Sequence, residues 1–95
     1  MEVLRPKELD MHPGDRIVGW ARGQLEIAQS ILDNPGGGLL FATQTVGQVK
    51  ASLRERDPGH WAELIVLLDQ VEDAAVRREF ETARGLLDRA TAELT

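Results

Sequence analysis

The sequence contains no cysteine and only two histidines among its 95 residues. The lack of cysteine excludes disulfides, thiolate catalysis and cysteine-ligated zinc, and it agrees with a reducing compartment. Long apolar runs are missing as well, since no stretch of about 18 apolar residues could span a bilayer. The opening stretch, MEVLRPKELDMHPGD, carries no apolar core of a secretory signal after its charges. We therefore expect a cytoplasmic protein with no membrane partner.

Positive charge is also scarce, because 11 Lys and Arg residues stand against 16 Asp and Glu, giving a formal net charge of −5. Proteins that coat phosphate backbones gain their affinity from Lys and Arg, so we do not expect nucleic acid as the partner of this acidic chain. The apolar fraction of 42% and the charged fraction of 28% are those of a soluble globular chain. At this length we expect one helical domain over residues 1–95 with a modest core. The excess of Arg over Lys is typical of GC-rich bacterial or phage genomes.

Helical periodicity dominates the first half of the sequence. Apolar residues recur every three or four positions, which is typical of one wide helical face. They are Ile17, Val18, Ala21, Leu25, Ala28 and Leu32, flanked by Trp20, Ile27 and Ile31. We predict a helix over about 15–33, which the segment 34–38 ends because Pro35 cannot donate to a helix and glycine accepts a left-handed turn. Residues 1–12 lack this period and are expected to form an irregular arm.

The next segment, LLFATQTVGQVKASLRER, begins with aromatic and β-branched residues, which are also typical of a strand. Its apolar positions nevertheless step by three and four. They are Leu39, Ala42, Val46, Val49 and Leu53. No second strand candidate exists to pair with it, and a lone strand is unstable. We therefore predict a second helix over about 39–55, with Asp57 and Pro58 beginning a third.

The remaining question is whether the chain turns within VEDAAVRREF, residues 71–80, or continues as one helix. An apolar stripe keeps helical spacing across this stretch, and neither Gly nor Pro interrupts residues 61–83. We therefore favour a bundle of three helices whose last helix is long and covers about 58–94. The alternative is a break near Asp73, which would cap a fourth helix that folds back to complete a four-helix bundle. In both cases the fold is all-α.

The two architectures differ in what covers the last apolar residues. At about 1.5 Å per residue, a helix over 58–94 is on the order of 54 Å long, about twice the length of either earlier helix. Its second half would expose apolar side chains, each forfeiting about 1.5 to 3 kcal/mol, unless a second molecule covered them. The residues of this expected interface are Val76, Phe80, Ala83, Leu86, Leu87 and Leu94. We therefore expect a protein–protein interaction module, such as an adaptor, inhibitor or assembly subunit, that forms a homodimer or binds another protein through its C-terminal helix.

Catalytic and metal-binding residues are few. Carboxylate di-metal bundles need Glu-x-x-His elements, which the sequence lacks. His60 and Glu63 supply two ligands at most and His12 stands alone, so we expect no metal and no cofactor. Neither serine has a neighbouring histidine or a nucleophile elbow. The triple glycine at 36–38 matches no phosphate-binding motif and is expected to connect two helices.

One spacing resembles an enzyme motif. The segment RERDPGH places Arg54 six residues before His60, at the junction between two expected helices. This resembles the Arg-x(4–6)-His signature of HEPN-type ribonucleases, small helical bundles in which Arg and His meet across a dimer at the scissile phosphate. The resemblance covers only these few residues. It implies metal-independent RNA cleavage, with Arg54 stabilising the phosphate and His60 acting as acid or base, and it stays an alternative to the interaction module.

A second alternative is a DNA-binding regulator. The segment TVGQVKASL, residues 45–53, looks like the first helix of a helix-turn-helix, with Gly47 in a typical position. The following helix would read the bases, yet it carries no Arg or Lys before Arg77. Close packing of two helices also explains Gly47. Trp20 and Trp61 are expected to be core or interface anchors before they are stacking platforms.

Overall fold

The computed structural model describes residues 13–34 and 36–94, with side chains from Arg16 onward. This part of the chain contains four α-helices and no strand. The helices are α2 (Pro13–Asp33), α3 (Leu39–Arg56), α4 (Ala62–Val76) and α5 (Phe80–Ala92). The all-α prediction is confirmed, and the segment with strand-like composition lies within α3. The arm expected over residues 1–12 lies outside the described residues.

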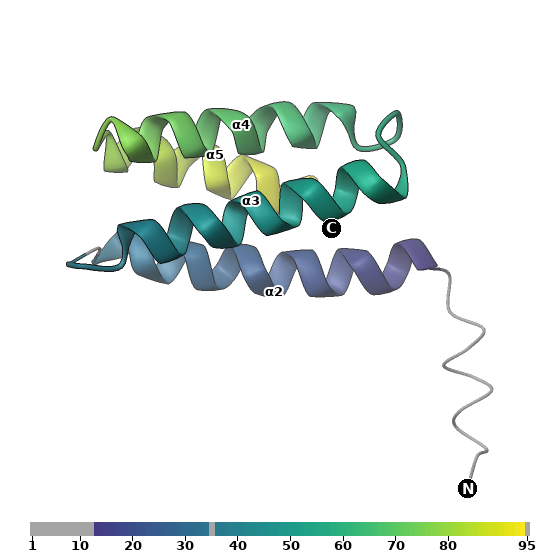
Figure 1. The fold of residues 1–95 in the computed structure, drawn as a ribbon, viewed down its shortest axis with the longest axis horizontal. Helices are drawn as coiled ribbons and strands as arrows, with labels where there is room; N and C mark the ends of the chain where they lie inside the picture. Colours follow the sequence, from purple (N-terminus) through teal and green to yellow (C-terminus); the bar gives the residue numbers. More distant parts are fainter. Residues whose placement is uncertain (1–12, 35, 95) are drawn as a thin grey trace, which may run out of the picture.

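The helices form an up-down-up-down bundle in which each helix runs antiparallel to the one before it (Figure 1). The α2–α3 hairpin packs on the α4–α5 hairpin, with α3 against α4 and with α2 closing the ring against α5. The connections before α3 and before α5 lie at one end of the bundle, and the connection before α4 lies at the other end. Short connections of this kind are what antiparallel neighbours need.

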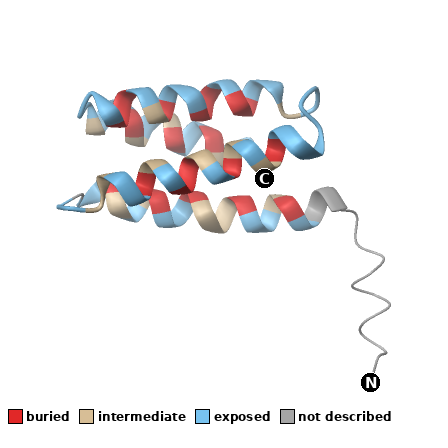
Figure 2. Cartoon of the chain, viewed as in Figure 1, coloured by how far each residue is buried: buried red, intermediate tan, exposed pale blue. Residues whose placement is uncertain are grey.

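One apolar core fills the space between the four helices, as the red segments of Figure 2 show. Its largest fully buried side chains are Leu25, Leu32, Leu53, Leu64, Leu68, Leu87, Val46, Val49 and Val71. Within α2, α3 and α4 they recur at spacings of three, four and seven, so each of these helices turns one face inward, and α5 contributes Leu87. Among the described residues, Thr45 is the one buried polar side chain, and its hydroxyl donates to the carbonyl of Phe41 at 2.8 Å. Its burial therefore leaves no unpaired donor.

The long C-terminal helix expected over 58–94 is not found, because the chain reverses direction between α4 and α5. The N–H of Glu79 donates to the carbonyl of Ala74 at 2.9 Å, and the N–H of Arg78 donates to that of Ala75 at 3.0 Å. This pair of bonds is a Schellman motif, in which Arg78 takes the left-handed position with φ of 65°. Glycine usually fills that position, so its absence from this stretch favoured the wrong prediction.

The alternative with a fourth helix gives the right number of helices but places the break a few residues too early. Asp73 lies inside α4 and forms an exposed ion pair with Arg77 at 3.1 Å, so it caps no helix. α5 begins at Phe80, and Glu79 before it makes no side-chain capping bond. The end of α4 is therefore fixed by backbone hydrogen bonds, and α5 begins without a side-chain cap.

Candidate protein-binding surface

The six residues of the expected C-terminal interface do not form one surface. Ala83, Leu87 and Leu94 are buried in the core of the single chain. Phe80 and Leu86 are half-buried against that core. Val76, at the end of α4, is exposed. The core of one molecule thus accounts for the apolar character of α5 without a second molecule.

The exposed apolar side chains lie mainly on the other hairpin. Among the described residues, the large exposed ones are Trp20, Ile27, Leu40, Phe41, Val66 and Val76. Four of these six belong to α2 and α3. Leaving such residues in water forfeits their transfer free energy, so a cluster of them indicates a surface that another molecule covers.

Three of these side chains share the seam between α2 and α3. A hollow of about 310 Å³ marks one end of this seam. Its lining contains Ile17 and Trp20 of α2 and Ser52 of α3, together with the charged residues Arg16, Glu55 and Arg56. Side chains four, seven and eleven residues away lie on the same side of a helix. On α2 these are Gln24, Ile27 and Ile31, and on α3, counting back from Ser52, they are Gln48, Thr45 and Phe41. Thr45 is buried and is left out. We define the α2–α3 seam as Trp20, Gln24, Ile27, Ile31, Phe41, Gln48 and Ser52.

The seven residues of the α2–α3 seam are uncharged, and charged side chains lie at its end around the hollow. Along α3, Lys50 is the one charged residue between positions 39 and 53, and its ammonium group binds carboxylates of α4. Along α2, Arg22 and Glu26 are the charged residues between positions 17 and 32, and Arg22 donates to the carbonyl of Leu94, beyond the end of α5. The centres of protein interfaces are depleted in charge and enriched in aromatic residues, and the seam has both properties.

The two hairpins also differ in net charge. Residues 13–57 hold five acidic and five basic residues and are neutral overall. Residues 58–94 hold eight acidic and four basic residues, a net charge of −4. Most of the negative charge of the molecule therefore lies on the α4–α5 hairpin, away from the seam.

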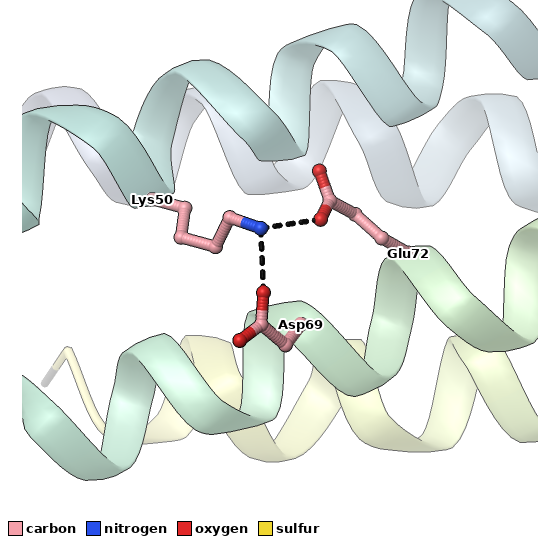
Figure 3. A network of polar contacts seen from close by, with 3 residues as sticks. All are labelled: Lys50, Asp69 and Glu72. Carbon is pink, nitrogen blue, oxygen red and sulfur yellow. Dashed lines mark hydrogen bonds and ion pairs between the residues drawn. The ribbon is translucent and has the colours of Figure 1, made fainter.

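The α3–α4 contact holds a polar network, drawn in Figure 3. Lys50 Nζ lies 2.5 Å from the Asp69 carboxylate and 2.6 Å from that of Glu72. These hydrogen bonds, first that to Asp69 and then that to Glu72, raise the pKa of Lys50 above its ordinary value. A Cβ at Gly47 would lie 3.1 Å from Glu72 Oε2, so glycine leaves room for this carboxylate. The network joins two helices, which agrees with a packing role for Gly47.

Arg54 and His60, the residues of the ribonuclease-like spacing, are both exposed near the connection between α3 and α4. The backbone N–H of His60 donates to Asp57 Oδ1 at 3.2 Å. The imidazole lies edge-on to the Trp61 ring, with centroids 4.5 Å apart. Within the described part of the chain, no hydrogen bond or ion pair joins the side chains of Arg54 and His60. One molecule therefore does not assemble these two groups into a catalytic pair.

The segment that looks like the first helix of a helix-turn-helix lies within α3. α3 and α4 run antiparallel along each other (Figure 1), and Lys50 joins them through its contacts with Asp69 and Glu72. The two helices of a helix-turn-helix cross at roughly 90–120°. The α3–α4 pair is therefore a helical hairpin, and its second helix does not project outward as a recognition helix does.

A second hollow, of about 500 Å³, lies between α4 and α5. Its lining residues are Ala62, Glu63, Val66, Leu67, Gln70, Arg89 and Glu93. Val66 is the exposed apolar side chain among them, and no aromatic residue contributes. Three of its seven lining residues are charged, as many as at the α2–α3 hollow, but it lacks the aromatic anchors that Trp20 and Phe41 give the α2–α3 seam.

The described residues contain no group of three or more His, Asp or Glu side chains that could hold a metal ion. None of the helices α2 to α5 has both the length and the apolar character that crossing a membrane requires. Comparisons with protein-family models, with curated proteins and with solved structures found no match. The choice of the α2–α3 seam as the candidate site therefore rests on the geometry of this chain.

Proposed function

We propose that this protein is a helical protein–protein interaction module that binds its partner through the α2–α3 seam. The observation that carries the proposal is the exposure of Trp20, Ile27 and Phe41, by 40%, 45% and 57%, along one uncharged seam. Buried aromatic anchors supply most of the binding energy of protein interfaces. Covering apolar surface contributes roughly 25 cal/mol per Å². A partner that covers the seam therefore gains from each of these side chains.

The architecture suits an adaptor, an inhibitor or an assembly subunit, which works by presenting a fixed surface. The core that holds α2 against α3 is built from the neighbouring faces of these helices, through residues such as Leu25, Leu32 and Val49. The exposed seam residues Trp20, Ile27 and Phe41 are not part of that core. Substitutions at the seam are therefore expected to change binding while they leave the fold intact.

Site-specific photo-cross-linking in the cells that produce the protein tests this proposal. p-Benzoylphenylalanine in place of Gln48, an exposed seam residue, is expected to form a covalent adduct with a protein that mass spectrometry identifies. The matched control places the same group at Gln70, which is also exposed but lies on α4. The adduct at Gln48 should disappear when Ile27→Glu puts a charge into the seam. Equal adducts from both positions, or adducts that survive Ile27→Glu, would rule out the seam as the binding surface.

A further inference from the structure

On the α2 side of the seam, two large apolar side chains lie on either side of a glycine. Trp20 and Ile27 lie two turns apart and are both partly exposed, and Gly23 lies one turn from each. A Cβ built at Gly23 meets nothing within 4 Å, so the surface above this residue is open. A two-fold axis between Gly23 and Gln24, the midpoint of Trp20 and Ile27, would set Trp20 of each copy against Ile27 of the other.

We infer that the partner of the seam is a second copy of this chain, with the two α2 helices antiparallel across a two-fold axis beside Gly23. This inference rests on the proposed function and names its partner. In the dimer, Trp20 of each copy covers Ile27 of the other. Gly23 lies beside the axis, where the missing side chain lets the two helix backbones approach closely. Phe41 of each copy extends the contact onto α3.

The distribution of charge over the two hairpins favours this face for self-association. Each copy carries a formal net charge of −5, and residues 58–94 account for −4 of it. Contact through two α4–α5 hairpins would therefore bring like charges together, which opposes association. The α2–α3 hairpin is neutral. An antiparallel pair also brings the exposed Arg16 near Asp33 at the carboxyl end of the partner's α2, where the helix dipole favours a cation.

The available area fits a dimer of modest affinity. α2 has 21 residues, and at about 1.5 Å per residue it is roughly 31 Å long. With two helices side by side, each about 10 Å across, the hairpin presents a face of about 600 Å². Two such faces, completely covered, bury at most about 1,200 Å², which is the lower end of the range for specific interfaces. We therefore expect a reversible dimer that dissociates on dilution.

Disulfide trapping tests the register, because the chain contains no native cysteine. Gly23→Cys places one thiol on each side of the proposed axis, and mild oxidation is expected to give a covalent dimer. Gly19→Cys is the matched control, since a Cβ there also meets nothing within 4 Å. The two copies of residue 19 would lie more than about 12 Å apart along the helices, beyond the roughly 7 Å Cα separation that a disulfide tolerates. Equal trapping of both variants, or trapping of Gly19→Cys alone, would overturn the register.

Sedimentation equilibrium tests the association itself. The wild-type protein is expected to show a monomer–dimer equilibrium, and the Ile27→Glu variant is expected to be a monomer. Val66→Glu places a charge on α4 outside the seam, so this control should keep the wild-type equilibrium. A wild-type monomer at every concentration, or a dimer that Ile27→Glu leaves unchanged, would overturn the second copy as partner. If the wild-type protein is monomeric and Gln48 still cross-links to a different protein, this inference fails while the proposed function stands. Absence of both dimer and cross-link would refute both.

Discussion

Arg78 takes a backbone conformation that glycine takes at less cost. Its φ is 65° at the left-handed position after α4, and its side chain is exposed. The left-handed region costs a non-glycine residue about 1 kcal/mol. We therefore expect Arg78→Gly to raise the free energy of unfolding by roughly 0.5–1 kcal/mol, measured by urea denaturation. Arg77→Gly is the control, because Arg77 has φ of −81° and gains no such relief.

The outcome for Arg77→Gly should have the opposite sign. This variant loses the exposed ion pair with Asp73 and adds a flexible residue at the end of α4, so its free energy of unfolding should fall. If Arg78→Gly also lowered the free energy of unfolding, residue 78 would not have the left-handed conformation after α4 in solution.

Lys50 gives the molecule a stability term with a defined pH dependence. Lys50→Met keeps nearly the length of the side chain but removes the cation between Asp69 and Glu72. We therefore expect the free energy of unfolding to fall by about 1 kcal/mol at neutral pH. This value is small because Asp69 is half exposed and water screens its charge. Folding raises the pKa of Lys50 above its ordinary 10.5. The contribution of the ammonium group is therefore complete below that value and is lost as pH rises through the raised pKa.

Urea denaturation of the two proteins at stepped pH checks this sign. The difference between wild type and Lys50→Met should stay constant from pH 7 to about pH 10 and shrink at higher pH. Lys50→Arg serves as the control, since a guanidinium keeps its charge throughout. A difference that disappears between pH 7 and pH 9 would show that another group is responsible.

At the scale of helices, the sequence predicts α2 and α3 because their periodic apolar residues are the ones the bundle buries. The same rule fails between α4 and α5. Ala75 and Ala83 lie eight residues apart, a spacing that one continuous helix also gives, and both are buried in the same core although the chain turns between them. The left-handed residue just after α4 is Arg78, whose type disfavours this conformation. Periodicity therefore could not distinguish one long helix from a hairpin.

The candidate site was only partly predictable for a similar reason. Trp20, Ile27 and Ile31 flank the apolar face of the first predicted helix, which is wider than the face that the core covers. The sequence does not say which flank a neighbouring helix covers, because that depends on the arrangement of the bundle. In the structure the other flank of α2 faces α5, where Gln29 donates to Asp88 at 2.7 Å. The flank of Trp20 is left partly exposed beside α3.

At the scale of the whole molecule, the bundle closes within one chain, so its core should not depend on a partner. Leu87 is fully buried in that core and Leu86 beside it is half-buried. Leu87→Ala is expected to lower the free energy of unfolding by about 2–5 kcal/mol, and Leu86→Ala by less. Urea denaturation over a range of protein concentrations checks this, since the loss for Leu87→Ala should be the same at concentrations where only monomer is present. A loss that vanished on dilution would place Leu87 at an interface between molecules.

The helices that are farthest apart in the sequence, α2 and α5, are neighbours in the bundle. The Arg22 guanidinium donates to the Leu94 carbonyl at 3.2 Å, and Arg84 of α5 lies 3.6 Å from the Asp33 carboxylate. A ribosome releases α2 first and α5 much later. The inner face of α2 is therefore not completely covered until α5 has been synthesised and has packed against it.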